Sequence, residues 1–346
     1  MQGAREQERK LKLPNLQREQ KQKKGKEKIM GEFDNIINEA TKQKSIDYGD
    51  ITEDIESKNV FTDEKKTFAE KMKEKKVQCF EMVDDACLDV MSSAENLKKF
   101  LAVQSRFEKY SLNNNLLIYM QKPEALRFKD FDGWVKDKVS LEGAKSFMIL
   151  EPSSYTGKDG KKHRGYNAKN VFDITDVGVH ENDYPQNKSY EQKALVRALV
   201  HDAPVPIIKS EQNIGDSAAV YDASAKTIYF KAGKNFDEIF PALANALAHA
   251  EMASKNEKYR VSDHEFASRC SAYVIAQKYG ASIAGADIHT IPQKFEGLEA
   301  EDIKKELSDI HENVKAISGR MSLVLEKDLN KEQVQQDKNV KTREER

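Results

Sequence analysis

The stretch Ala246-Leu247-Ala248-His249-Ala250-Glu251-Met252-Ala253 decides how the second half of this chain folds. It has the setting of an H-E-x-x-H zinc motif, a helix on which two histidines one turn apart bind the metal and a glutamate activates the metal-bound water. Only the first histidine is present. Ala250 stands where the glutamate belongs and Ala253 where the second histidine belongs. The segment therefore predicts the helix of such a site without its catalytic set.

The residues around this stretch predict two strands and two helices. Apolar side chains at three- and four-residue spacing predict a helix over residues 237–255. Two short runs rich in branched and aromatic residues, 219–221 and 227–230, flank a polar turn and predict strands. A second helix is expected downstream, with Gly280 placed to end it in a left-handed conformation.

The start of the second helix bears on metal binding. Ser262 and Glu265 have the spacing of a capping box. Glu265 and His264, together with His249, leave open an unconventional metal site. The alternative is that His249 is a packed polar residue and His264 a solvated residue at a helix N-terminus. Glu251 does not replace the missing base, because positions two apart on a helix do not face each other.

A second group of motifs lies upstream, and its members follow one another in a fixed order. They are a helical run at 110–125, an aromatic turn at 131–134, a strand start at 141–145 and a strand at 171–175. Their order resembles the single-stranded-DNA-binding domain of ArdC-type antirestriction proteins. The strands and helices around His249 resemble the zincin-like domain of the same family, which is related to the ImmA/IrrE metallopeptidases.

This resemblance implies a fold, a function and two departures from the family pattern. The implied fold is α+β, with a small α/β single-stranded-DNA-binding domain followed by a zincin-like α+β domain and charged helical or disordered extensions. The implied role is plasmid or conjugative-element establishment and protection from host restriction. Ala144 replaces the glutamate of the family's G-E-K motif. Ala267 and Arg269 replace acidic residues of the run that supplies the third metal ligand, so that Glu265 alone remains.

We expect five segments along the chain. They are a charged arm at 1–66, a single-stranded-DNA-binding domain at 67–185, a pseudo-metallopeptidase domain at 190–290, an amphipathic or coiled-coil helix at 298–330 and a polar tail at 331–346. Within the second segment, residues 67–109 are expected to form one or two helices.

The first domain combines the cationic and aromatic side chains that hold single strands, namely cations for the phosphates and rings for base stacking. The candidate contacts are Tyr110, Asn113, Asn114, Asn115, Tyr119, Gln121, Lys122, Trp134, Lys145, Lys161, Lys162 and Arg164. The last three lie on a predicted basic hairpin over residues 155–170, with Asp159-Gly160 as a two-residue turn. The alternative for Trp134, Phe128 and Phe131 is burial in the core of a small domain.

An apolar stripe in the last part of the chain has two interpretations. It consists of Ile303, Leu307, Ile310, Val314, Ile317, Met321 and Val324, at alternating four- and three-residue steps. Such a stripe forms a coiled-coil seam, through which the chain would self-associate or bind a partner helix. The alternative is an amphipathic helix packed on its own domain.

Composition limits the remaining possibilities. The 346 residues carry a net charge of -1, so attraction to nucleic acid has to come from local patches. The three cysteines match neither a disulfide framework nor a zinc pair, and no apolar run is long enough to span a bilayer, so we expect a cytoplasmic protein.

The favoured hypothesis is a single-stranded-DNA-binding, antirestriction-like protein with a catalytically inactive metallopeptidase-like domain and no cofactor. The alternatives are an active zinc metallopeptidase using an unconventional site, and a partner-recruiting protein without DNA binding.

Overall fold

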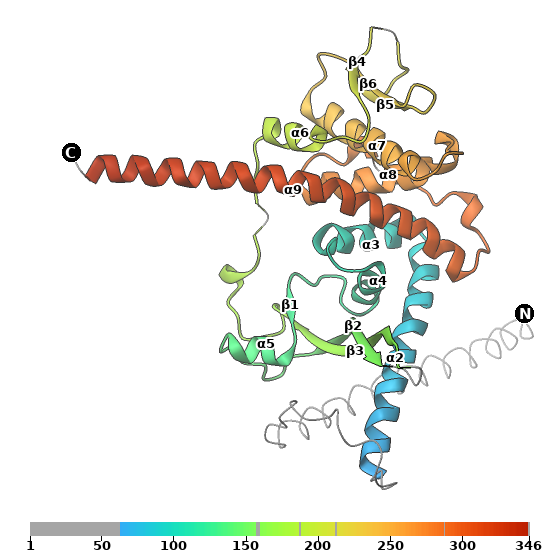
Figure 1. Cartoon of the computed structure of the whole chain (residues 1–346), viewed down its shortest axis with the longest axis vertical. Coiled ribbons are helices and arrows are strands. Elements are labelled where there is room, and N and C mark those ends of the chain that lie inside the picture. Colours follow the sequence, from blue (N-terminus) through green and yellow to red (C-terminus); the bar gives the residue numbers. More distant parts are fainter. Residues whose placement is uncertain (1–62, 157–159, 187, 212, 287, 345–346) are drawn as a thin grey trace, which may run out of the picture. The chain divides into compact units, whose positions relative to one another are not determined.

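The computed structural model describes most of the chain after residue 62 (Figure 1). The described residues are 63–156, 160–186, 188–211, 213–286 and 288–344, of which 63–69 and 328–344 are described by their backbone alone. The expected charged N-terminal segment at 1–66 therefore lies almost entirely outside the described residues. None of the described helices combines the length and apolar character that a membrane crossing requires.

The first half of the described chain is a helical layer beside a small antiparallel sheet. Its elements are α2 (Asp63–Val90), α3 (Ala94–Phe107), α4 (Leu112–Gln121), β1 (Phe128–Lys129), α5 (Phe131–Lys136), β2 (Ser146–Thr156), β3 (Lys162–Asp173) and η1 (Glu181–Asp183). The strands are ordered β1-β3-β2 and both pairs are antiparallel. The two helices expected within residues 67–109 are thus present as α2 and α3.

The second half has a three-stranded sheet followed by helices. Its elements are α6 (Gln192–Val200), β4 (Ile207–Lys209), β5 (Ala219–Asp222), β6 (Thr227–Phe230), α7 (Phe236–Ser254), α8 (Val261–Lys278), η2 (Ala284–Ala286), η3 (Gln293–Phe295) and α9 (Ala300–Glu344). The strand order is β4-β6-β5, with β4 parallel and β5 antiparallel to β6. The two predicted strands and both predicted helices are confirmed, and so is the α+β fold class.

The ends of α8 show one confirmed and one wrong prediction. Gly280 has a left-handed φ of +68°, and the Ala281 N–H donates to the Ala276 carbonyl over 2.8 Å, which closes the helix. The predicted capping box at Ser262 and Glu265 is wrong. The helix begins at Val261, so Ser262 already lies inside its first turn, and its hydroxyl donates to Asp263 instead.

The apolar stripe of α9 is covered by the chain itself. Ile303, Leu307, Ile310, Val314, Ile317 and Met321 are buried, and α9 packs against α6, α7 and α8. The ion pair between Arg320 and Glu251 adds a polar contact between α9 and α7 at 2.5 Å. The expectation of self-association through this stripe is therefore corrected, because its apolar surface is already used within the chain. The segment expected as a polar tail continues α9 to Glu344.

The two halves share one continuous set of buried apolar side chains, and α3 packs directly against α8. Two polar contacts accompany this packing. The buried Glu108 carboxylate after α3 pairs with Lys278 of α8 at 2.9 Å. Gln104 Nε2 of α3 lies 3.3 Å from His311 Nδ1 of α9, and both side chains are buried. The halves are thus joined by a core as well as by the connecting segment.

Candidate functional site

His249 is buried within a hydrogen-bonded cluster between α7 and α8. Its Nδ1 contacts the Tyr259 hydroxyl, and its Nε2 lies 2.8 Å from Ser268 Oγ and 3.2 Å from Glu265 Oε2. A protonated Nε2 donates to the Glu265 carboxylate, whereas an unprotonated Nε2 accepts from Ser268. Both imidazole nitrogens therefore have partners within the protein. The interpretation of His249 as a packed polar residue agrees with this geometry.

The residues around His249 are arranged for mutual pairing. The hydrogen bond with His249 holds the pKa of Glu265 below its usual value, and Arg269 pairs with the other carboxylate oxygen at 3.3 Å. Burial raises the pKa of Tyr259. The ring of His264 stacks on Tyr259 with centroids 4.8 Å apart, so His264 is half-buried rather than solvated.

The donor set does not fit a zinc site. A catalytic zinc has three protein ligands, and His249 and Glu265 supply two. Ala250 is fully buried on the same helix, and Ala253 adds no ligand. Over the ranges that the structure describes, no group of three or more His, Cys, Asp and Glu side chains is placed to hold a metal ion.

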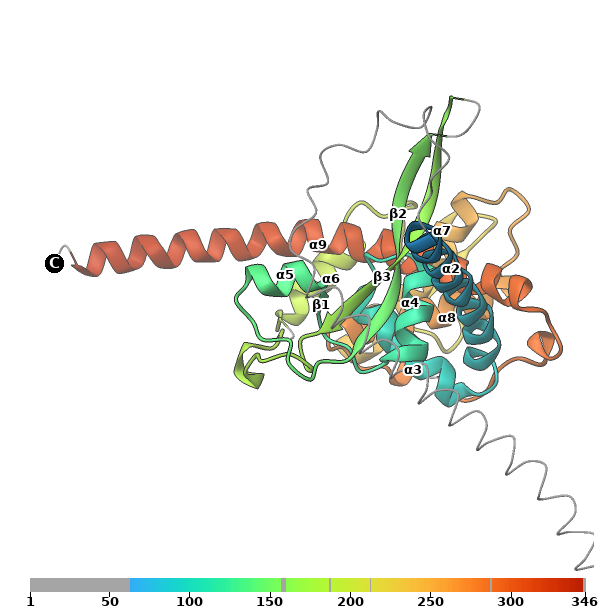
Figure 2. The same ribbon diagram turned by 90° about the horizontal axis from the view of Figure 1, so that it is seen from below.

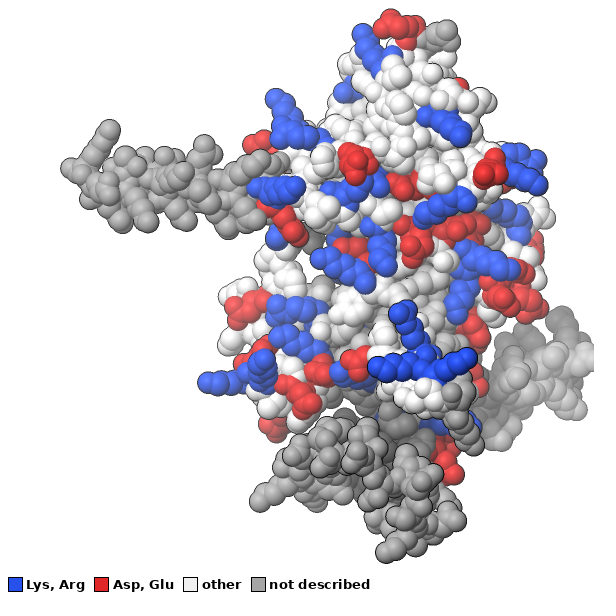
Figure 3. Space-filling model, in the orientation of Figure 1, with Lys and Arg blue, Asp and Glu red and all other residues white. Residues whose placement is uncertain are grey.

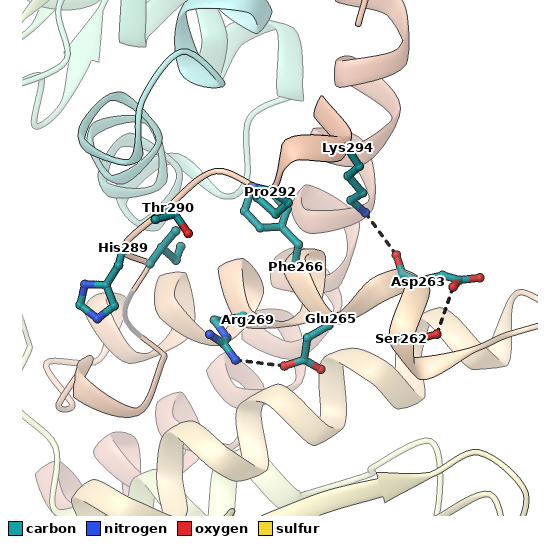
Figure 4. A pocket seen from close by; sticks show the side chains of 10 residues that line it. Ser262, Asp263, Glu265, Phe266, Arg269, His289, Thr290, Pro292 and Lys294 are labelled. Carbon is teal, nitrogen blue, oxygen red and sulfur yellow. Dashed lines mark hydrogen bonds and ion pairs between the residues drawn. The ribbon is translucent and has the colours of Figure 1, made fainter. Parts of the chain in front are cut away.

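An open pocket of about 630 Å³ adjoins this cluster on the outer side of α8 (Figure 4). Glu265 and Arg269 lie in its wall and point toward each other. Lys294, across the pocket, donates to the Asp263 carbonyl over 3.3 Å. Lys294 also pairs with Glu306 at 3.7 Å and Asp263 with Arg260 at 3.0 Å, so these charged lining groups all have partners of opposite charge.

Three of the predicted DNA-contacting amides serve the fold instead. Asn114 of α4 donates to the Leu150 carbonyl and accepts from the Leu150 N–H, at 2.9 and 2.8 Å. Gln121 makes the same pair of contacts with the backbone of Met148, both at 2.9 Å. Asn115 is fully buried. Since β2 is an edge strand, α4 covers its free edge with side-chain amides, and these groups are not available to bases.

Two further candidates, Tyr119 on α4 and Lys122 directly after this helix, have partners within the chain. The Tyr119 hydroxyl donates to Asp89 over 2.6 Å and the ring is buried, which together raise the pKa of the tyrosine. Lys122 pairs with Asp176 at 2.7 Å. Tyr119 is therefore corrected from a stacking residue to a core residue, and Lys122 to an ion-pair partner.

The two remaining aromatic candidates pack inward. Trp134 is 1% exposed and donates its indole N–H to the Phe172 carbonyl over 2.9 Å, as its core alternative predicts. Tyr110 is half-buried against Phe107 and Phe128, with ring centroids 5.8 and 4.9 Å apart, and burial raises its pKa. Trp134 is therefore closed to base stacking, whereas the ring of Tyr110 is partly covered by its two aromatic neighbours.

The predicted basic hairpin is confirmed and is longer than expected. β2 and β3 pair from Ser146 with Phe172 to Thr156 with Lys162. The predicted two-residue turn at Asp159-Gly160 lies partly outside the described residues, because residues 157–159 are not described. Gly160 has a φ of +71°, the left-handed conformation that glycine adopts without steric cost.

The outer half of this hairpin, residues 151–156 and 160–167, is called the arm below. It extends beyond α4 and α5 (Figure 2), and its side chains are exposed on both faces apart from the half-buried Ser153 and Gly165. Because side chains alternate along a strand and cross-strand partners share a face, the arm has two different faces. Tyr155 and His163 lie on one face, and Lys162, Arg164 and Tyr166 on the other.

The aromatic face of the arm is ordered by contacts between its own strands. Tyr155 and His163 are cross-strand partners, and their rings stack with centroids 5.5 Å apart at 24°. A Cβ at Gly165 would lie 3.3 Å from the Tyr155 ring, so the absence of a side chain there allows the ring to lie across the strand. Tyr155 is nevertheless 58% exposed. In Figure 3, basic side chains gather where the hairpin of Figure 1 comes forward.

The structure thus brings together only part of the predicted set. Lys161, Lys162 and Arg164 lie on or beside the arm and are exposed. Lys145 is exposed but precedes the opposite end of β2, and the half-exposed Asn113 lies on α4. Sequence reasoning missed the exposed rings of Tyr155 and Tyr166. Their signal was the alternation of aromatic and basic residues within a hairpin whose strands carry few apolar residues.

Comparisons with known proteins were made for the whole chain. No family model and no curated protein matches it. The chain is similar to two crystal structures of the antirestriction protein ArdC from plasmid R388. The metal-free structure is 13% identical with a TM-score of 0.36, covering 63% of this chain and 85% of that chain. The Mn(II)-bound structure is 12% identical with a TM-score of 0.40, covering 66% and 96%.

These are structures of the family that the motifs resemble. Because both TM-scores lie below 0.5, the function of this chain has to be argued from its own residues.

Proposed function

We propose that this chain binds single-stranded DNA through the arm and that its protease-like half is not catalytic. The observation that carries the proposal is the arm itself, a two-stranded ribbon exposed on both faces, with stacked rings on one face and cations on the other. Rings hold unpaired bases by stacking and cations hold phosphates, and these two contacts dominate the binding of single strands. Antirestriction on a plasmid or conjugative element is the role that the motif resemblance adds.

A single strand fits the arm better than a duplex does. A two-stranded ribbon can enter the major groove of duplex DNA, where it reads base edges through hydrogen-bonding side chains. One face of the arm presents the Tyr155 ring, which is 58% exposed, and in a duplex the base faces that it would stack on are covered. We therefore expect tighter binding to single strands.

The second part of the proposal rests on the His249 cluster. Both imidazole nitrogens are engaged within the protein, and Ala250 leaves no carboxylate where the general base of the motif belongs. In the absence of that carboxylate and of a third ligand, neither water activation nor metal retention has the groups it needs.

Fluorescence anisotropy with the full chain tests DNA binding. We expect a labelled 20-nucleotide single strand to bind more tightly than the same sequence as a duplex, with affinity falling as salt rises. The double variant Lys162→Gln, Arg164→Gln should reduce the slope of log affinity against log salt by about 1.4, because each phosphate contact on a single strand contributes about 0.7.

The control is Lys209→Gln with Lys226→Gln, two exposed lysines of the second half. It should keep the parent slope. Equal affinity for single and double strands, or a parent-like slope in the arm variant, would overturn the proposal.

A further inference from the structure

We infer that the DNA site continues inward from the arm along its Tyr155 face to Phe131, forming one track with a stacking position at each end. This inference rests on the proposed single-strand binding. It adds a second contact residue, the length of the site and the path of the bound strand along the hairpin.

The face that carries Tyr155 and His163 leads toward the start of α5. Continuing inward on the same face, the alternation of side chains gives Glu151 and Asn167, then Ile149 and Lys169. The Lys169 ammonium pairs with Glu151 at 2.9 Å and with Asp130 at 2.8 Å. Asp130 caps α5 by accepting from the Gly133 N–H over 2.8 Å. The first turn of α5 is therefore linked to this face through the ion pair between Asp130 and Lys169.

One cation and two carboxylates lie along this part of the face. Lys169 lies between two carboxylates, and its hydrogen bonds with Asp130 and Glu151 raise its own pKa, while its hydrogen bond lowers the pKa of Asp130. The ammonium offsets one of the two negative charges, so it reduces the repulsion of phosphates without cancelling it. Two exposed cations, Lys136 and Lys138, lie at the end of α5 and just after it.

Phe131 is the exposed ring at the inner end of the track. It directly follows Asp130 and is 40% exposed, although an aromatic side chain of this size is usually buried. Trp134 of the same helix is fully packed, and the packing of α5 against β1 and β3 therefore leaves Phe131 uncovered. Figure 2 shows α5 beside the inner part of the hairpin and the arm extending beyond it.

The separation of the two rings sets the length of the site. Ile149, the partner of Lys169, and Tyr155 are six residues apart on β2. At about 3.3 Å per residue this is about 20 Å. A stacked strand advances about 3.4 Å per nucleotide, so the track holds about six nucleotides, and fewer if the strand is extended. Oligonucleotides of three nucleotides are too short to reach both rings.

A length series with the full chain tests the track. Unlabelled oligothymidylates of 3, 4, 6, 8 and 12 nucleotides would compete with a labelled 20-nucleotide strand. We expect Phe131→Ala to weaken binding of the 8- and 12-nucleotide strands by about 5-fold or more, the effect of one lost stack, and to leave the 3-nucleotide strand unchanged. Val135→Ala, which shortens an exposed aliphatic side chain on the same helix, should leave every length unchanged.

A spectroscopic readout supports the same test without depending on short strands. The chain has one tryptophan, Trp134, which is buried, so Phe131→Trp introduces a distinct exposed reporter. Its fluorescence should fall on addition of a 12-nucleotide strand, whereas the fluorescence of Val135→Trp should change less.

The outcomes separate the two proposals. If the Lys162 and Arg164 variant and Tyr155→Ala bind like the parent, the proposed function fails. If those variants weaken binding while Phe131→Ala matches the parent at every length and Phe131→Trp gives no quenching, the arm binds DNA and the track is wrong.

Discussion

The inner half of the β2–β3 hairpin, residues 146–150 and 168–173, and the arm belong to the same pair of strands but have opposite surroundings. The inner half is mostly buried, and the amides of Asn114 and Gln121 bind the free edge of β2. The arm has exposed residues on both faces. Polar side chains near the inner half are therefore committed to the fold, while most of those on the arm are exposed to solvent.

This difference bears on how polar residues are interpreted. A two-stranded ribbon alone is marginally stable, and an uncovered strand edge tends to pair with other chains. The cations on the arm oppose such pairing and at the same time suit phosphates. Asn114 of α4 also suits nucleic acid by its chemistry, yet it hydrogen-bonds a strand of its own chain. Four predictions test the contrast, beginning with the largest expected change in stability.

Removing a side-chain amide that covers the free edge of β2 should lower the free energy of unfolding the most. Asn114→Ala leaves the N–H and C=O of Leu150 without their side-chain partners, and each unsatisfied buried group costs about 1–3 kcal/mol. We expect the free energy of unfolding to fall by about 2–4 kcal/mol in chemical denaturation. Asn113→Ala, at the half-exposed neighbouring position, is the control. A loss no larger than that of the control would show that α4 does not hold the edge.

A substitution in the His249 cluster should lower stability, as a substitution at the covered edge of β2 does and a change in the arm does not. His249→Ala removes the partner of Tyr259 and Ser268, and we expect a loss of about 1–3 kcal/mol in the free energy of unfolding. Metal analysis after dialysis should find no stoichiometric zinc in the parent. His180→Ala, at an exposed position, should stay within about 0.5 kcal/mol. About one zinc per chain, lost in His249→Ala, would contradict the non-catalytic proposal.

A pH dependence should appear at the contact between α3 and α9. Burial lowers the pKa of His311 from its ordinary value of 6.5, partly opposed by Glu312 and Glu108 and assisted by Lys315. The neutral form is thus favoured in the folded state, so its contribution is complete above pH 6.5 and is lost as pH falls toward the lowered pKa.

The free energy of unfolding, measured by denaturation between pH 7.5 and 5, should therefore decrease below pH 6.5. His311→Gln should reduce that decrease, while His180→Gln should keep the parent dependence. Identical profiles for the parent and His311→Gln would remove His311 as the cause.

Excising the arm should change stability least and DNA binding most. Replacing residues 152–166 with Asn-Gly joins the paired residues Glu151 and Asn167 by a favoured two-residue turn. Because most of the described residues in this segment are exposed, the free energy of unfolding should stay within about 0.5 kcal/mol of the parent. Anisotropy should show loss of single-strand binding. A large loss of stability would mean that the arm supports the fold, and retained binding would place the site elsewhere.

The sequence predicts those parts of the fold that depend on local periodicity. The helix through His249, the β5–β6 pair, the basic hairpin and the stripe of α9 follow from spacing alone. The stripe could not reveal its partner, because a coiled-coil seam and a helix packed on its own chain need the same pattern. In the structure the stripe packs against α6, α7 and α8 of its own chain.

The site is less predictable for a physical reason. Whether Asn114 faces solvent or the backbone of Leu150 depends on the approach of a strand 36 residues away, which no local pattern contains. Exposure of Tyr155 likewise depends on how far the hairpin extends past its covering helix. The capping box is wrong by a shift of two residues, since the N-cap of α8 is Arg260 and the start of the helix at Val261 places Ser262 inside it.

The packing of α3 against α8 has a consequence for how such a protein can evolve. Deleting residues 190–290 would expose the face of α3 that α8 covers and leave the Glu108 carboxylate without Lys278. Substitutions at Ala250 or Ala253 change chemistry while leaving that contact in place. Changes on α7 can therefore alter the chemistry around His249, while the contact between α3 and α8 continues to constrain the helices of the second half.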